Sequence, residues 1–207
     1  MQTVREAGAI EIFFDFASPY AYFMLPRLEE LAGMHGRPLI RRPIMVWALL
    51  KAHGLPAPME HAVRRDYMLA DMARSARFHR MPYRQPERMT VSTHNAARAW
   101  YGLERVDAAA ARRFGEAVFR ARFVEGRDIG ESGAVAEIGR EAGVDAEAAM
   151  ADNRSREALV DANREAVSRG AWGSPFVFVD AQAFFGADRL PQLAWYLSGE
   201  NGKITET

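Results

Sequence analysis

The sequence predicts an α/β protein in which one β-sheet is built from both ends of the chain and is interrupted by a long helical insertion. Short runs rich in β-branched and aromatic residues lie near the two ends, at residues 10–16, 37–45 and 174–185. Such runs are typical of buried strands. Between them, from about Trp47 to Arg169, apolar residues recur at helical spacing. Neither end alone can bury a sheet, so we expect the two ends to form one sheet together.

The N-terminal part begins with a strand at residues 10–16, and we expect a helix to follow it directly. Pro19 suits the first turn of a helix, and Ser18 before it is a favourable N-cap residue. The helix should run to about Met34, because Gly33 and Gly36 lie on either side of this residue. The run at residues 37–45 then predicts a second strand.

The insertion is expected to contain roughly six helices. Breaks rich in Gly and Pro separate them, at residues 53–58, 80–86, 125–133 and 141–145. After the insertion, two adjacent apolar runs predict a β-hairpin, and residues 186–199 predict a short amphipathic helix.

The resulting order is β-α-β, a helical block, and then β-β-α, which is the order of a thioredoxin fold with a large all-helical insertion between its halves. We therefore divide the chain into a thioredoxin-like domain, at residues 8–46 plus 170–200, and an inserted helical domain at residues 47–169.

Composition excludes several classes of function. Lys plus Arg and Asp plus Glu both number 27, so the net charge is zero, which argues against a nucleic acid partner. No apolar run is long enough to span a bilayer, and the first residues lack the pattern of a signal peptide, so we expect a soluble cytoplasmic protein without a membrane partner. The absence of cysteine excludes thiol catalysis by the protein itself, and the five histidines show no metal-binding spacing, so we expect no metal site.

The junction "FFDFASPYAYF" (residues 13–23) lies where thiol redox enzymes built on a strand–helix unit carry C-x-x-C, but Ser18 stands here with no sulfur nearby. One interpretation is an ordinary helix cap. The other interpretation uses the positive end of the helix, which favours an anion, and a hydroxyl that donates to a bound thiolate. Because the chain has no cysteine, that thiol would come from a ligand.

Two C-terminal motifs have similar pairs of interpretations. Pro175 stands at the start of a buried strand. A turn with a trans Ser174–Pro175 bond is the default interpretation. In the alternative, the bond is cis, and the backbone before Pro175 is free to pair with an extended ligand. Gly186 breaks the next strand, and Ala187 and Asp188 open the last helix. In one interpretation, Asp188 interacts favourably with the positive end of the helix dipole. In the other, it binds a ligand ammonium while the backbone N–H groups hold a ligand carboxylate.

A basic stretch runs from Arg64 to Arg88, with seven Arg against three acidic residues. It is either a solvated helix face or the source of a local positive field that attracts anionic substrates. Lys51 would extend this field. The Met and aromatic residues of the insertion are expected mostly in the core, and any that line a cleft would suit a flat aromatic substrate.

The motifs "FFDFASPYAYF" and "RGAWGSPFVFVDAQAFFGADRL" together resemble the terminal signatures of the 2-hydroxychromene-2-carboxylate isomerases and kappa-class glutathione transferases, and the similarity runs along nearly the whole chain. The resemblance implies a DsbA-like thioredoxin fold, a homodimer and glutathione as cofactor. Ser18 would be the catalytic residue, in contact with the glutathione sulfur, and Pro175 the cis-proline. The implied glutathione-binding residues are Ser18, Arg64, Ser174, Pro175, Gly186, Ala187 and Asp188, and the implied substrate residues are Lys51, Tyr20 and Trp47. The chain departs from the family pattern at Leu55, Phe176 and Trp47.

The function that the resemblance implies is a glutathione-dependent isomerase of aromatic catabolism, of the kind found in naphthalene degradation. It would convert a 2-hydroxychromene-2-carboxylate, a small aromatic carboxylate, to trans-o-hydroxybenzylidenepyruvate through a glutathione thiolate adduct. Two alternatives stay open. One is a kappa-like transferase that consumes glutathione by conjugation, and the other is a non-catalytic DsbA-like binding protein.

Overall fold

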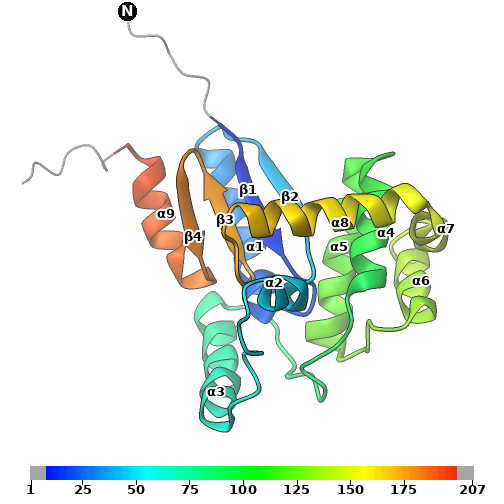
Figure 1. Cartoon of the computed structure of the whole chain (residues 1–207), viewed down its shortest axis with the longest axis horizontal. Coiled ribbons are helices and arrows are strands. Elements are labelled where there is room, and N and C mark those ends of the chain that lie inside the picture. The colour runs from blue at the N-terminus through cyan, green and yellow to red at the C-terminus, as the bar shows by residue number, and fades with distance from the viewer. Residues whose placement is uncertain (1–7, 200–207) are drawn as a thin grey trace, which may run out of the picture.

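The computed structural model describes residues 8–199, which form a four-stranded mixed sheet in the order β2-β1-β3-β4 (Figure 1). β1 runs parallel to β2 and antiparallel to β3, and β3 and β4 form an antiparallel hairpin. The strands are β1 (Ile10–Phe14), β2 (Leu39–Pro43), β3 (Phe176–Val179) and β4 (Gln182–Phe185). Because β1 pairs with β3, the prediction of one sheet built from both ends of the chain is confirmed.

The helices before the hairpin are α1 (Pro19–Met34), α2 (Val46–Ala52), α3 (Ala62–His79), α4 (His94–Glu104), α5 (Ala108–Arg120), the π-helical turn η1 (Ala121–Glu125), α6 (Ser132–Glu141), α7 (Ala146–Ala151) and α8 (Asn153–Ser168). The insertion thus has seven α-helices, so the prediction of roughly six missed one. None of the predicted breaks separates α4 from α5 or α7 from α8. The α7 helix is only six residues long, and Asp152, directly after it, is already the N-cap of α8, so no loop separates these two helices.

The helices lie in layers around the sheet. In Figure 1, α1 lies behind the sheet and α8 crosses in front of it, α4 to α7 gather on one side, and α3 extends below the body. Four of the five β1 side chains and all four of β3 are buried, as expected for strands covered on both faces. Phe14 and Phe16 pack against Trp100 of α4 and Phe119 of α5. These aromatic contacts tie the end of β1 to the helical insertion.

Local predictions near the motifs are largely confirmed. Ser18 is the N-cap of α1, Pro19 is at the first helical position, and the helix ends at Met34. The first strand, however, ends at Phe14, two residues before the predicted end, because the Asp15 side chain accepts a hydrogen bond from Ala17 N and closes a turn.

The C-terminal helix is also shorter than predicted. It starts as the 3₁₀ turn η2 (Ala187–Arg189) and continues as α9 (Leu190–Leu197). Gly186 precedes η2 with a φ of 100°, a left-handed backbone that favours glycine. The domain boundaries given above stay a prediction, and Glu200, at the end of the second range, lies outside the described residues. Within residues 8–199, no helix combines the length and apolar character needed to cross a membrane.

Candidate thiolate and substrate site

The candidate site is a cleft of about 1390 Å³ where β1 ends and α1 begins. Its walls come from the β1–α1 turn, α2, α3 and the two segments around Pro175 and Gly186. Nine of the ten predicted site residues line it: Ser18, Tyr20, Trp47, Arg64, Ser174, Pro175, Gly186, Ala187 and Asp188. Lys51 is exposed in the last turn of α2 and is not among the lining residues, so its predicted role has no support from this cleft.

Ser18 is held at the N-terminus of α1 by hydrogen bonds on both sides of its hydroxyl. Its Oγ accepts from Ala21 N at 3.3 Å and donates to the Ser174 carbonyl oxygen at 3.1 Å. The first turn of a helix has N–H groups without intrahelical partners, and Pro19 has no N–H. Among the described residues, the Tyr20 N–H has no protein partner. This N–H is therefore the donor that the helix end can offer to an anion, and the single Ser18 hydroxyl hydrogen can donate to one only by turning away from the Ser174 carbonyl oxygen.

The Ser174–Pro175 peptide bond is cis, as the resemblance implied. Two hydrogen bonds fix the segment: Asp15 N donates to Ser174 Oγ at 2.8 Å, and Gly186 N donates to the Pro175 carbonyl oxygen at 3.0 Å. The fold thus brings together the three motifs that lie at the two ends of the sequence.

Asp15 is a site residue that the sequence interpretation missed, having counted it as part of the first strand. Its side chain is 3% exposed, and its carboxylate accepts from Ala17 N, Val46 N and Thr93 Oγ1 at 2.9, 2.8 and 2.7 Å. Burial raises the pKa of this carboxyl, and the three hydrogen bonds oppose that effect only in part. The available sequence signal was one carboxylate inside an otherwise apolar run, "IFFDF".

Tyr20 and Asp71 form a second polar pair in the cleft, and Asp71 is another residue that was not predicted. Tyr20 Oη donates to Asp71 Oδ2 at 2.8 Å, and Arg74 NH2 donates to Asp71 Oδ1 at 2.8 Å. Burial alone would raise the pKa of Asp71, but the hydrogen bonds from Arg74 and Tyr20 outweigh it and lower that pKa. Burial and the Asp71 carboxylate raise the pKa of Tyr20, so the phenol stays neutral at physiological pH.

Two charged side chains, Arg64 and Asp188, line the cleft. Arg64 lies exposed in the first turn of α3. Asp188 lies exposed in η2, where it contacts Arg189 at 3.4 Å. A Cβ atom on Gly186 would lie 2.5 Å from Asp188 Oδ1, so the missing side chain leaves room for this carboxylate over the turn.

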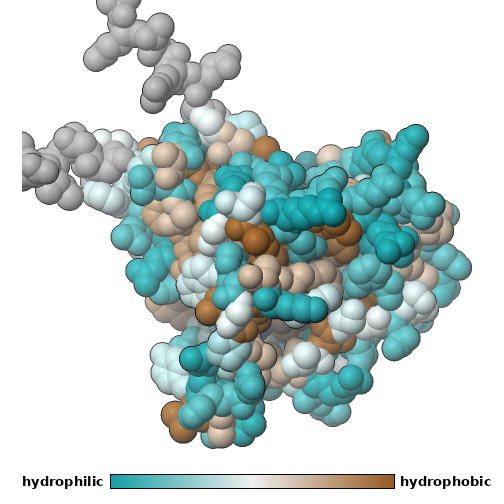
Figure 2. Space-filling view, viewed as in Figure 1, coloured by the Kyte–Doolittle hydropathy of each residue, from teal (hydrophilic) through white to brown (hydrophobic). Residues whose placement is uncertain are grey.

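The rest of the cleft is mostly apolar, and its large apolar residues include Trp47, Leu50, Leu55, Met59, Met68, Met72, Phe78, Met89, Trp172, Phe185 and Leu190. Trp172 and Phe185, both unpredicted, pack with ring centroids 3.9 Å apart. Figure 2 shows apolar side chains gathered over α2 in the middle of this face, below a polar band along α8. Methionine and aromatic walls of this kind suit a flat apolar ligand.

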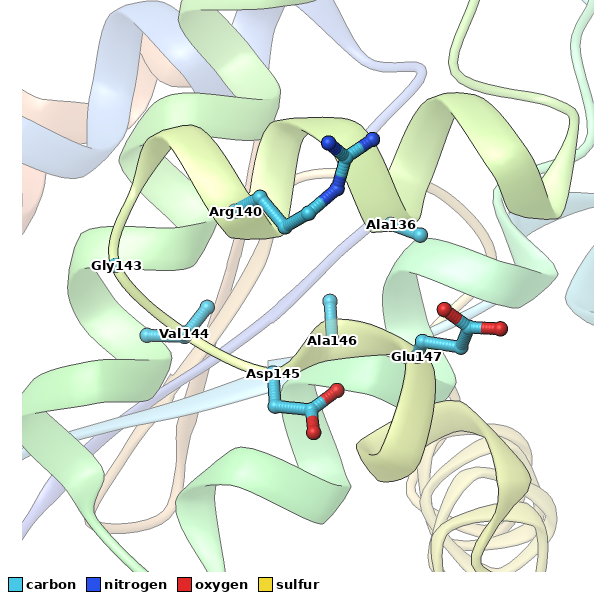
Figure 3. A pocket seen from close by; sticks show the side chains of 7 residues that line it. All are labelled: Ala136, Arg140, Gly143, Val144, Asp145, Ala146 and Glu147. Atoms are coloured by element: carbon cyan, nitrogen blue, oxygen red, sulfur yellow. The ribbon is translucent and has the colours of Figure 1, made fainter.

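A smaller hollow of about 440 Å³ lies between α6 and α7 (Figure 3). Arg140, Asp145 and Glu147 are its charged residues, and none of the sequence motifs reaches it. In the described part of the chain, no three His, Asp or Glu side chains are grouped so as to hold a metal ion. We therefore place the candidate site in the larger cleft.

Comparison with known proteins agrees with this geometry. Residues 9–198 match the family model of the DsbA-like thioredoxin domain, and the chain belongs to this family. It is 31% identical over 193 residues to a 2-hydroxychromene-2-carboxylate isomerase of Sphingobium xenophagum, covering 91% of this chain and 97% of the relative. It is 24% identical over 205 residues to glutathione S-transferase kappa 2 of Caenorhabditis elegans, covering 91% of each.

The fold agrees with that of a solved 2-hydroxychromene-2-carboxylate isomerase. The TM-score is 0.81 at 23% identity, over 96% of this chain and all of the other. The predicted DsbA-like fold with a helical insertion is thereby confirmed.

Proposed function

We propose that the protein is a glutathione-dependent isomerase that acts on 2-hydroxychromene-2-carboxylates or similar aromatic carboxylates and yields trans-o-hydroxybenzylidenepyruvate or its analogue. The observation that carries this proposal is Ser18 Oγ at a helix N-terminus, 3.1 Å from the carbonyl before a cis-proline, in a chain without cysteine. A thioredoxin-type thiolate site without a thiol of its own fits a thiol ligand. The 31% identical isomerase from Sphingobium xenophagum supports the choice of reaction.

The residues of the cleft fit glutathione. The Tyr20 N–H supplies a donor for a thiolate, and the Ser18 hydroxyl supplies a second one when it turns from the Ser174 carbonyl oxygen to the ligand. Arg64 supplies a cation for a carboxylate. The backbone of Ser174 suits a peptide-like middle part, and the Asp188 carboxylate with the N-terminus of η2 suits an end that carries both an ammonium and a carboxylate.

The protein's part in the chemistry is binding and charge stabilisation. When bound, glutathione supplies a nucleophilic thiolate that adds to the conjugated substrate and leaves again unchanged. Ser18 and the helix N-terminus favour the ionised sulfur, because both place positive charge or a hydrogen-bond donor against it. The apolar wall excludes water, and Trp47 with Trp172 and Phe185 offers ring faces to a flat substrate.

A kappa-like glutathione transferase is the second candidate, and the 24% identical kappa relative favours it. A transferase, like an isomerase, needs a cleft that holds glutathione and a second molecule together. The cleft of about 1390 Å³ is larger than the usual site of one drug-sized ligand, so it has room for both. The two candidates differ in whether glutathione is consumed.

The test is calorimetric titration with glutathione, followed by ultraviolet monitoring of a 2-hydroxychromene-2-carboxylate and assay of free glutathione. We expect binding and conversion with no loss of glutathione. Loss of one glutathione per turnover would favour the transferase, and failure to bind glutathione would leave the non-catalytic DsbA-like binding protein.

The homodimer and the cytoplasmic location belong to the same proposal. Light scattering on the purified full chain should give twice the mass of 23.2 kDa. A monomer at micromolar concentration would contradict the dimer without affecting the proposed chemistry.

A further inference from the structure

Asp15 is a buried charged side chain that thiolate binding at Ser18 does not itself require. Only four polar or charged side chains are fully buried in the described part of the chain: Asp15, Thr93, Arg122 and Ser155. Two of these four, Asp15 and Thr93, form a hydrogen bond with each other. A buried carboxylate is costly unless its oxygens are satisfied, so a specific arrangement must offset the cost.

The three partners of Asp15 come from three different segments. Ala17 N lies in the β1–α1 turn, Val46 N begins α2, and Thr93 Oγ1 precedes α4. All three groups donate, so they match an ionised carboxylate, which only accepts. An amide in its place would direct N–H groups at one of these donors.

Thr93 strengthens this interpretation. It occupies the N-cap position of α4, but its hydroxyl makes no cap bond to its own helix and donates to Asp15 Oδ1 at 2.7 Å. A threonine cap on α4 would contribute about 1 kcal/mol to helix stability. The side chain is used instead to join the insertion to the end of β1.

Asp15 also contacts the Ser18–Ser174 pair through its backbone. Ser18 N donates to the Asp15 carbonyl oxygen at 2.9 Å, and Asp15 N donates to Ser174 Oγ at 2.8 Å. The Asp15 carboxylate holds Ala17 N, in the residue directly before Ser18. The carboxylate thus sets the path of the turn that delivers Ser18 to the Ser174 carbonyl.

We propose that Asp15 is a positioning residue for the thiolate site, which uses Thr93 of the insertion and Val46, directly before the insertion, to hold Ser18 in place. This inference rests on the proposed binding of glutathione. It assigns the insertion a part in thiol activation as well as in forming the cleft wall.

The test compares variants of the full chain by the ultraviolet absorbance of bound glutathione thiolate as a function of pH. Thr93→Val keeps the Asp15 charge and should raise the pKa of the bound thiol, reducing the thiolate fraction below that pKa about tenfold. Asp15→Asn also removes a negative charge from the cleft wall, which by itself favours a thiolate, so the thiol pKa should rise less than in Thr93→Val. Affinity for S-methylglutathione, which has no ionisable thiol, should change less than about twofold. Thr93→Ser keeps the hydroxyl and should retain the wild-type pKa.

Ser155→Ala is the matched control. Ser155 is equally buried and donates to the Ala149 carbonyl oxygen at 2.8 Å between α7 and α8, away from the cleft. Its loss should lower thermal stability without changing the thiol pKa. If the bound thiol in Thr93→Val keeps the wild-type pKa, this inference alone is overturned. No thiolate signal in wild type would overturn the proposed function and this inference with it.

Discussion

Two regions of the cleft, the Ser18 region and the apolar wall, are built differently. In the Ser18 region, Asp15, Ser18, Thr93 and Ser174 are linked by hydrogen bonds of 2.7 to 3.1 Å that use both side chains and backbone groups. In the apolar wall, Trp47 and Phe78 are 57% and 80% exposed. Under the proposed function, the Ser18 region binds one chemical group in one geometry and the apolar wall accepts substrates of different shapes. Thiol recognition and substrate choice would then be separable in this fold.

The largest expected effect is that of Ser18→Ala, because it removes the hydroxyl donor from the thiolate. We expect turnover to fall about 100-fold, as for the loss of one preorganised donor to a developing anion. Stability should fall by about 1 to 2 kcal/mol, since the change removes the N-cap bond from Ala21 N and the bond to the Ser174 carbonyl oxygen. Steady-state kinetics and chemical unfolding measure the two quantities.

Asp107→Ala is the control for the cap. Asp107 caps α5 by accepting from Ala109 N at 2.8 Å and does not line the cleft. It should lose similar stability and keep full turnover. Equal turnover in the two variants would mean that Ser18 serves only as a helix cap.

Arg64→Ala should weaken glutathione binding about tenfold, because a charge-assisted hydrogen bond to a carboxylate is lost. The neighbouring Arg65 pairs with Asp66 and does not line the cleft, so Arg65→Ala should leave binding unchanged. Calorimetry at two salt concentrations measures both. Equal losses in the two variants would indicate a general field of the basic stretch instead of a direct contact.

Trp47→Ala tests the apolar wall of the cleft. The KM for the aromatic substrate should rise about three- to tenfold with the loss of a ring contact, while glutathione affinity stays the same. Trp195 of α9 is 38% exposed and lies outside the cleft, so Trp195→Ala is the matched control. A parallel loss of glutathione affinity in Trp47→Ala would contradict the separation of thiol recognition from substrate choice.

The smallest effect concerns the pH dependence of stability through Asp71. Because the pKa of Asp71 is lowered in the folded state, its stabilising contribution is fully present above about pH 4 and is lost as pH falls through the lowered folded pKa. Asp71→Asn should therefore be less stable than wild type at pH 6, by less than about 1 kcal/mol, and equal to it at low pH.

Urea unfolding at several pH values measures this difference. Asp161 pairs with Arg164 on the exposed face of α8, so Asp161→Asn should show almost no change at either pH. The same stability gap at low and neutral pH would contradict the account of Asp71.

The sequence predicted the features that depend on local pattern. Ser18 as a cap and the sheet from both ends follow from spacing and composition, and the family resemblance implied the cis bond at Pro175. Asp15 and Thr93 could not be found this way, because their pairing depends on how α4 packs against the end of β1, 78 residues away in sequence. Lys51 was assigned by resemblance, but it lies outside the cleft lining.

The most direct test of the central claim is a pH titration of glutathione bound to the wild-type protein, followed by thiolate absorbance. The account predicts a thiol pKa clearly below that of free glutathione, because the helix N-terminus and the Ser18 hydroxyl favour the ionised sulfur. A bound thiol that titrates like free glutathione would contradict it, since the junction at Ser18 would then bind the ligand without activating it.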